Sequence, residues 1–194
     1  MVETVVIKRK EFEIVERLGN RSFKVSRKGK LYFLKNYEGD QNGFDRFVKN
    51  QHKFFTSSVP TPKVYMYDKI SLVAIVDFIE GESVTEMLMK EDLPDYIYEE
   101  IFKLDYFARN DKMLLDFKPC NFKWDGKKLV YLPFRHANYK QEDSFATTSI
   151  NLWFYSKHFV QYLKQNGLPV DESRLGNEYA TNKEIALTVC KYYL

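Results

Sequence analysis

Near the start of the chain, residues 12–18 and 22–27 alternate between apolar and polar, which is the period of a half-buried strand. Mostly apolar runs at residues 4–7 and 31–35 lie on either side of them, which gives four candidate strands. Gly19 ends the second run, and Lys28-Gly29-Lys30 separates the last two. Because such runs joined by short turns pair as antiparallel strands, the pattern predicts a β-meander over residues 2–35. A second hairpin is predicted from residues 63–67 and 71–76.

From Gly43 the apolar spacing changes to three and four residues, the period of a helix. The predicted apolar face carries Phe44, Phe47, Val48, Gln51, Phe54 and Phe55. Later helices are predicted over residues 84–90, from Leu93 to about 108, over the aromatic stretch 149–163, and over 182–193. The chain therefore reads as a sheet with one helix, followed by a mainly helical part.

A short loop near the middle of the chain carries Asp116, Lys118 and Asn121. We predict a hairpin directly after it, with strands at residues 121–124 and 128–132 and a tight turn at Asp125-Gly126. A carboxylate, an ammonium and an amide at this spacing can place a base, a phosphate-binding cation and a metal ligand around one point. The alternative is a polar loop that only joins a helix to a hairpin.

The pattern Asp-x-Lys-Pro-x-Asn resembles the catalytic loop of protein kinases. The resemblance implies that Asp116 faces the hydroxyl group of the acceptor and that Lys118 neutralises the transferred phosphoryl group. It also implies that Asn121 holds Mg²⁺, with Mn²⁺ as a substitute, and that ATP is the cofactor.

The N-terminal strands resemble the N-terminal lobe of the same family. Gly19-Asn20-Arg21-Ser22-Phe23-Lys24-Val25 matches part of the glycine-rich turn that covers the ATP phosphates, although its second and third glycines are missing. The resemblance implies that Gly19 and Ser22 lie at the phosphates and that Lys35 reaches them from the end of its strand. The alternative for Lys35 is a lysine that simply extends into solvent from a strand end.

Two further segments match the family in position. Asp77-Phe78-Ile79-Glu80-Gly81 resembles the hinge between the lobes, which implies that the backbone of Asp77, Phe78 and Ile79 faces the adenine ring. The alternative is an exposed acidic strand end. Gln51 stands where the family has a glutamate that pairs with the strand lysine. A glutamine can accept a hydrogen bond from Lys35 but cannot neutralise it.

One departure bears directly on catalysis. The return strand of the hairpin ends in Leu132-Pro133-Phe134, so Pro133 occupies the position of the metal-binding aspartate of Asp-Phe-Gly. Proline offers no side-chain ligand, and Asp125, Glu142 and Asp143 are the nearby carboxylates that could replace it. The sequence therefore leaves two functions open: an altered phosphotransferase, or a pseudokinase that acts as a nucleotide- or protein-binding regulatory module.

The expected fold is α+β, a two-lobed protein-kinase-like fold with a truncated second lobe, divided at residues 1–79 and 80–194. The expected partners are ATP and a protein or small-molecule acceptor.

With 30 basic and 27 acidic residues and a net charge of +3, the chain lacks the excess of positive charge that is typical of a nucleic-acid binder. It contains no apolar run of about 18 residues, so no membrane is expected. Cys120 and Cys190 form no disulfide framework, and without a signal-peptide core the expected location is cytoplasmic. An unrelated α+β domain is the third alternative.

Overall fold

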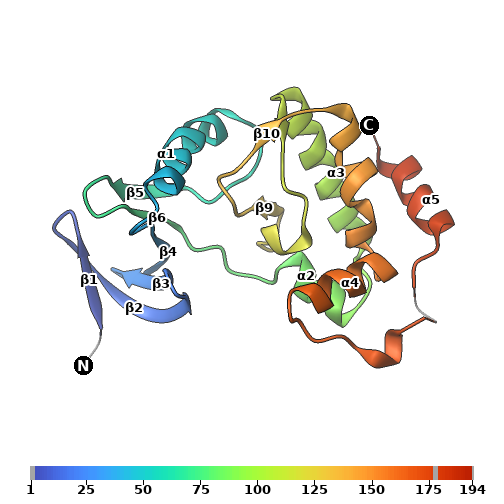
Figure 1. Ribbon diagram of the computed structural model, residues 1–194, viewed down its shortest axis with the longest axis horizontal. Helices are drawn as coiled ribbons and strands as arrows, with labels where there is room; N and C mark the ends of the chain where they lie inside the picture. The colour runs from blue at the N-terminus through green and yellow to red at the C-terminus, as the bar shows by residue number, and fades with distance from the viewer. Residues whose placement is uncertain (1–2, 177–178, 194) are drawn as a thin grey trace. The chain divides into compact units, whose positions relative to one another are not determined.

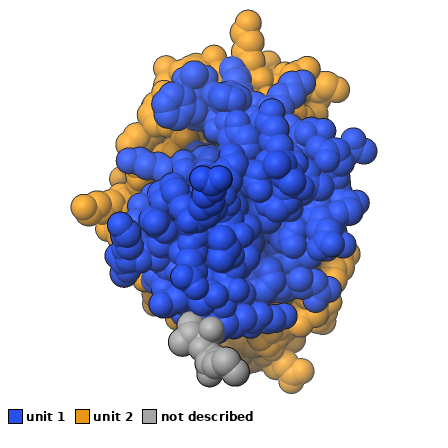
Figure 2. Space-filling view, turned by 90° about the vertical axis from the view of Figure 1, so that its left-hand side faces the viewer, with its two compact units in different colours: residues 1–56, 61–79 blue, residues 57–60, 80–194 orange. Residues whose placement is uncertain are grey.

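The computed structural model describes residues 3–176 and 179–193 (Figure 1). The chain forms two compact units, coloured separately in Figure 2: residues 1–56 with 61–79, and residues 57–60 with 80–194. The segment 57–60 groups with the second unit because Pro60 accepts a hydrogen bond from Tyr131 N–H at 2.9 Å. Antiparallel sheet and helix are both present, so the expected α+β class is confirmed.

The first unit contains one six-stranded antiparallel sheet in the order β1-β2-β3-β4-β6-β5. Its elements are β1 (Thr4–Ile7), β2 (Lys10–Gly19), β3 (Ser22–Arg27), β4 (Lys30–Asn36), α1 (Gln41–Thr56), β5 (Val64–Asp68) and β6 (Val73–Asp77). The first four strands pair consecutively, which confirms the meander; residue 2 of the predicted range lies outside the described residues. The second predicted hairpin is β5 and β6.

The alternation of the strands places their apolar residues on one face of a curled sheet. The buried cluster on this face consists of Ile7, Phe12, Val25, Tyr32, Leu34, Val73 and Ile75. The curl brings the β1–β2 turn to β5, where Lys8 Nζ donates to Tyr67 O at 2.7 Å. The sheet thus encloses its own core, and this burial is the main source of its stability.

Helix α1 buries Phe44, Phe47 and Phe54, as its apolar spacing predicts. Phe55 was expected on the same face but is 87% exposed, so that assignment is wrong. The reason is geometric: successive helical residues are rotated by about 100°, and the buried stripe runs through Phe47 and Phe54. Phe55 therefore points beyond the edge of the stripe in the last turn of the helix.

The second unit is mainly helical and carries two short β-ladders. Its helices are α2 (Val84–Lys90), α3 (Asp95–Asn110), α4 (Lys157–Gln165) and α5 (Asn182–Tyr192), and its strands are β7 (Met113–Leu114), β8 (Phe122–Trp124), β9 (Leu129–Tyr131) and β10 (Ala137–Asn138). Strand β8 pairs with β9, and β10 pairs with β7. The predicted hairpin after the Asp116 loop is therefore confirmed.

The single helix predicted over residues 149–163 is wrong. The chain forms a π-helical turn (Phe145–Ser149) and a 3-10 turn (Ile150–Trp153), extends through Phe154, and begins α4 only at Lys157. Ser156 starts α4 because its hydroxyl accepts the N–H of Phe159 at 3.2 Å. The continuous aromatic sequence concealed this break, since residues on both sides of it are buried.

Two expectations concern features outside the fold itself. No helix within the described ranges combines the length and apolar character needed to cross a membrane. Cys120 and Cys190 are both exposed and carry free thiols.

Candidate functional site

The Asp116 loop lies between β7 and a 3-10 turn (Pro119–Asn121) that leads into β8. The side chains of Asp116 and Lys118 are 39% and 56% exposed, and Asp116 Oδ2 lies 3.9 Å from Lys118 Nζ. At this exposure an ion pair contributes about 0–1 kcal/mol, so the two groups do little to stabilise the fold. They are nonetheless held side by side at the surface of the unit.

The backbone of this loop is fixed by two buried aromatic side chains. The Tyr131 hydroxyl accepts Asp116 N–H at 3.2 Å and donates to Arg135 O at 2.9 Å. Trp153 Nε1–H donates to Phe117 O at 2.8 Å. Burial raises the pKa of Tyr131, so its hydroxyl keeps the proton that it donates. The loop is therefore rigid where it carries Asp116.

Asn121 closes the loop from the other end. Its Nδ2 donates to the backbone carbonyl of Asp116 at 2.9 Å, and its own N–H donates to Lys118 O at 2.9 Å. Because the amide nitrogen faces Asp116 O, the amide oxygen of Asn121 remains an acceptor, with only the Cys120 thiol donating weakly at 3.9 Å. The structure thus brings together the three residues that the sequence proposed for this loop.

The loop rests on a cluster of buried rings. Phe117 stacks on Phe122 with centroids 5.9 Å apart and planes 7° apart. Trp153 meets Phe122 and Phe145 nearly edge to face, at 5.2 Å and 5.4 Å. Edge-to-face and offset pairs of this kind add about 0.5–1.5 kcal/mol each beyond the burial of their area. The cluster explains why Phe117, between Asp116 and Lys118, is itself buried.

In the first unit, Lys35, Ser22 and Gly19 also lie together. Lys35 and Ser22 are register partners in β4 and β3, and Lys35 Nζ donates to Ser22 Oγ at 3.2 Å. Gly19 pairs with Ser22 across the β2–β3 turn. Within the described residues no carboxylate pairs with Lys35, and Gln51 is half-buried on α1. An ammonium without an anionic partner is suited to a phosphate ligand.

In the hinge-like segment, residues 77–79, several groups already make contacts within the first unit. Asp77 Oδ1 pairs with Lys30 Nζ at 2.8 Å, and Asp77 N–H donates to Lys63 O at 2.8 Å. Phe78 N–H donates to Leu31 O at 3.3 Å, and the Phe78 ring lies 4.7 Å below Lys24 Nζ. The sequence analysis expected the backbone of residues 77–79 to face an adenine ring. In the structure, the N–H groups of Asp77 and Phe78 are already hydrogen-bonded within the unit.

The residues present do not complete the expected Mg²⁺ site. Pro133 follows β9 and has no side-chain oxygen. Asp125 Oδ1 is committed to the hairpin turn, where it accepts the N–H groups of Lys127 and Lys128 at 2.9 Å each. No cluster of three His, Cys, Asp or Glu residues in metal-binding geometry occurs in the described part of the chain. Of the two positions compared with the metal ligands of protein kinases, Asn121 has a side-chain oxygen that could bind a metal ion and Pro133 has none.

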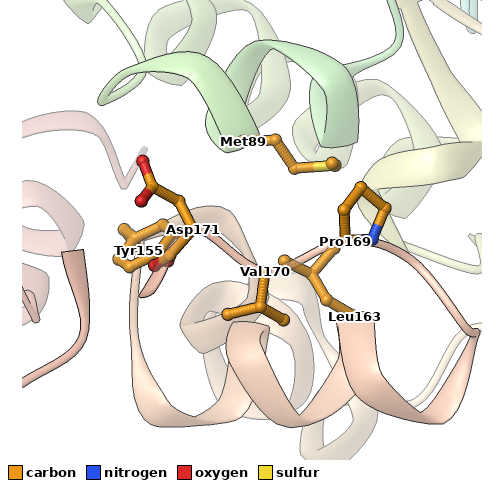
Figure 3. Close-up of a pocket in the computed structure, with 6 residues that line it drawn as sticks. All are labelled: Met89, Tyr155, Leu163, Pro169, Val170 and Asp171. Carbon is orange, nitrogen blue, oxygen red and sulfur yellow. The ribbon is translucent and has the colours of Figure 1, made fainter. Parts of the chain in front are cut away.

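A separate pocket of about 210 Å³ lies within the second unit (Figure 3). Met89 of α2 faces Leu163, Pro169 and Val170 across it, and Tyr155 and Asp171 complete the lining. Its polar groups are engaged, because Asp171 Oδ1 accepts from Ser173 N–H at 2.9 Å and Asp171 O accepts from the Tyr155 hydroxyl at 3.0 Å. The pocket is small for a nucleotide, since drug-sized ligands occupy about 300–1,000 Å³.

No protein-family model matches the chain, and a search of curated proteins finds none that is significantly similar.

Sequence reasoning missed the residues that fix the loop. Tyr131 lies in an apolar strand and Trp153 in an aromatic stretch, so the pattern assigned both to the core. Both are indeed buried, but each also makes a hydrogen bond to the loop backbone. The available signal was chemical: buried Tyr and Trp have a polar atom that needs a partner.

Proposed function

We propose that this protein is an ATP-dependent phosphotransferase of the protein-kinase-like superfamily, with a two-lobed fold and a short second lobe. It would transfer the γ-phosphate of ATP to a hydroxyl group of a protein or small-molecule acceptor. One observation carries the proposal: the Asp116 loop has a backbone fixed by buried partners, and yet it presents an exposed carboxylate and ammonium.

Preorganisation is the reason why this observation favours catalysis. Phosphoryl transfer depends on positioning and on electrostatic stabilisation, with little covalent chemistry for the protein to perform. A site of this kind needs its charged groups held within about 0.5 Å of their working positions by neighbours that do not move. Tyr131, Trp153 and Asn121 provide that support to the backbone of the loop.

Each predicted residue then has a role in the transfer. Asp116 would accept the proton of the acceptor hydroxyl as its oxygen forms a bond to the γ-phosphorus. The bond between that phosphorus and the β–γ bridging oxygen breaks, and ADP leaves with the electron pair. Lys118 would offset the charge of the transferred group, and Lys35 with Ser22 would hold the phosphates. Mg²⁺ bound with ATP normally neutralises charge on the phosphates.

The arrangement of elements along the chain also supports the proposal. An antiparallel sheet with one helix after its fourth strand forms the first unit, and a mainly helical unit carries the loop with a hairpin directly after it. The resemblance implied this sequence of elements.

A second candidate function is that of a pseudokinase, a nucleotide- or protein-binding regulatory module. Pro133 favours it, because a missing metal ligand leaves charge on the phosphates poorly offset. The loss of one preorganised electrostatic contact typically costs about 10²–10³ in rate. We therefore expect phosphate transfer to be slow compared with the usual kinase range of about 1–100 s⁻¹.

The first experiment tests nucleotide binding by titrating ATP in a thermal-shift assay, with and without Mg²⁺ or Mn²⁺. Lys35→Ala should weaken ATP binding by about 10- to 150-fold, since a hydrogen bond to a charged group contributes about 1.5–3 kcal/mol. Lys69→Ala, in the exposed turn between β5 and β6, is the matched control and should leave binding unchanged. Equal affinity in all three proteins would remove Lys35 from the site.

The second experiment separates the two candidates by measuring transfer of labelled γ-phosphate. Asp116→Asn should abolish measurable transfer, whereas Asp45→Asn, on the exposed surface of α1, should not change it. Pro133→Asp should increase transfer if the missing ligand limits the rate. Inactivity of the wild type and of Pro133→Asp, with ATP binding intact, would favour the regulatory module.

A further inference from the structure

Two cations donate to the hydroxyl group of Tyr65 at one end of the curled sheet, and a third lies over the neighbouring ring of Tyr32. Lys10 Nζ lies 3.2 Å and Arg27 Nη1 lies 3.3 Å from Tyr65 Oη, and both donate to it. Lys30 Nζ lies 5.3 Å from the centroid of the Tyr32 ring, which in turn lies 4.7 Å from that of Tyr65. We call Lys10, Arg27, Lys30 and Tyr65 the Tyr65 cluster.

The strand period explains why these residues meet. Lys10 precedes the buried Phe12 by two residues, Arg27 follows the buried Val25 by two, and Lys30 precedes the buried Tyr32 by two. Since residues two apart point to the same face of a strand, all three cations follow the apolar face of the curled sheet. The pairing of Arg27 with Lys30 places them at the same end of that face.

The charge of the cluster is poorly compensated. Lys30 pairs with Asp77 at 2.8 Å. For Lys10 and Arg27, the described residues provide no carboxylate partner, and the two share one neutral phenol oxygen. The hydrogen bond from Lys10 and the charge of Arg27 lower the pKa of Tyr65, which is the effect expected of an uncompensated positive field.

More positive charge lies at the same end of the sheet. Arg9 in the β1–β2 turn and Lys28 in the β3–β4 turn are both exposed. Strands β2 and β3 are neighbours, so the two turns lie beside each other. Because like charges so close together repel, an anion with several charges would stabilise the whole group.

We propose that the Tyr65 cluster binds a phosphate group that carries at least two negative charges, with Arg27 and Lys10 donating to its oxygens. A guanidinium fork and an ammonium suit the oxygens of a phosphate. The rings do not favour a stacked base, because the Tyr65 face is covered by Lys10 at 4.7 Å and the ring packs against Tyr32 and Phe12.

This site is distinct from the one proposed for the phosphates of ATP. Lys30 and Lys35 are five residues apart in β4, so their side chains point to opposite faces of the sheet. At about 3.4 Å per residue they are also about 17 Å apart along the strand. The inference therefore does not depend on the proposed kinase function.

The test is a calorimetric titration with inorganic pyrophosphate, performed in the Lys35→Ala background so that the proposed ATP site does not contribute. Lys10→Gln and Arg27→Gln should each weaken pyrophosphate binding at least tenfold. Lys69→Gln removes the same charge from the exposed β5–β6 turn, outside the Tyr65 cluster, and should change it less than twofold. Binding to the parent protein should also weaken as salt is raised.

Absence of pyrophosphate binding in the Lys35→Ala protein, or an equal loss in all three glutamine variants, would overturn the proposal.

Two further probes identify the source of the phosphate group: vesicles that contain a phosphorylated phosphatidylinositol, and a single-stranded DNA 20-mer. Capture of the vesicles that is lost in Arg27→Gln assigns the site to a lipid headgroup. Pyrophosphate binding without vesicle capture assigns it to a soluble phosphate. DNA binding that survives both Lys10→Gln and Arg27→Gln, together with failure of pyrophosphate to compete, contradicts the proposal.

Discussion

Replacing Asp105 with asparagine should change how the stability of the second unit depends on pH. Asp105 lies on α3 and is 1% exposed. Its Oδ2 lies 3.2 Å from Arg109 Nε, and its carboxylate accepts the N–H of Phe145. Burial raises the pKa of Asp105 to about 6, and the charge of Arg109 and the hydrogen bond from Phe145 keep it from rising further.

The sign of the effect follows from linkage. In the unfolded chain the group titrates near 3.8, so between about pH 4 and 6 the folded protein binds more protons than the unfolded one. Ionisation of Asp105 therefore removes stability as the pH rises through this range. A shift of about two pKa units corresponds to about 3 kcal/mol. Asparagine cannot ionise, so relative to wild type the variant should gain up to about 3 kcal/mol between pH 4 and 7.

Urea unfolding at a series of pH values, followed by tryptophan fluorescence, measures this difference. Trp124 and Trp153 are both in the second unit, so the signal reports on that unit. The difference between variant and wild type cancels the titration of the other carboxylates. Asp45→Asn, on the exposed surface of α1, should give a flat difference. If Asp105→Asn instead becomes less stable relative to wild type as the pH rises, the ion pair with Arg109 outweighs burial and the reasoning is wrong.

Three further predictions concern the second unit. Tyr131→Phe should lower the free energy of unfolding, measured with urea, by about 1–3 kcal/mol, because Asp116 N–H loses its hydrogen-bond partner, and it should lower the rate of phosphate transfer more than it weakens ATP binding. Gly81→Ala should destabilise by about 3 kcal/mol or more, since its φ is +108° and the new Cβ would overlap the backbone oxygen of Trp124; Gly126→Ala, with φ of +91° and open space, should cost only about 1 kcal/mol in the same assay. Ser83→Ala removes one half of the capping box of α2 and should lower the unfolding free energy by about 1 kcal/mol, and a loss below 0.2 kcal/mol would contradict that role.

Local periodicity was sufficient to predict most elements of the chain. Most strands of the meander, α1 to α3 and α5 have apolar residues at the spacing of one buried face, whereas β6 and β9 are short apolar runs bounded by turn residues. Turn chemistry supported the hairpin, because Asp125 caps its own turn and Gly126 adopts a positive φ. In each case the information lies within a few consecutive residues.

Where residues are buried on all sides, the same method fails. Between Phe145 and Leu163 almost every aromatic side chain is buried, so no period distinguishes a helix from a chain that changes direction at Ser156. The support of the Asp116 loop was also beyond the sequence. Trp153 reaches Phe117 O across 36 positions, a contact that depends on tertiary packing.

The Asp116 loop is hard to explain as a connector alone. A connector at the surface can leave its backbone to water, whereas this one takes a hydrogen bond from a fully buried Trp153 and another from Asn121. The side chains that the loop presents add little to the stability of the fold, because Asp116 and Lys118 are exposed and their ion pair at 3.9 Å is weak. Neutralising either charge should therefore leave the free energy of unfolding almost unchanged. The loop thus presents side chains that add little to stability, and buried residues hold them in place. This arrangement is the one expected of a functional site. Pro133 does not alter this conclusion, since it removes a metal ligand but leaves the hydrogen bonds that position Asp116 intact.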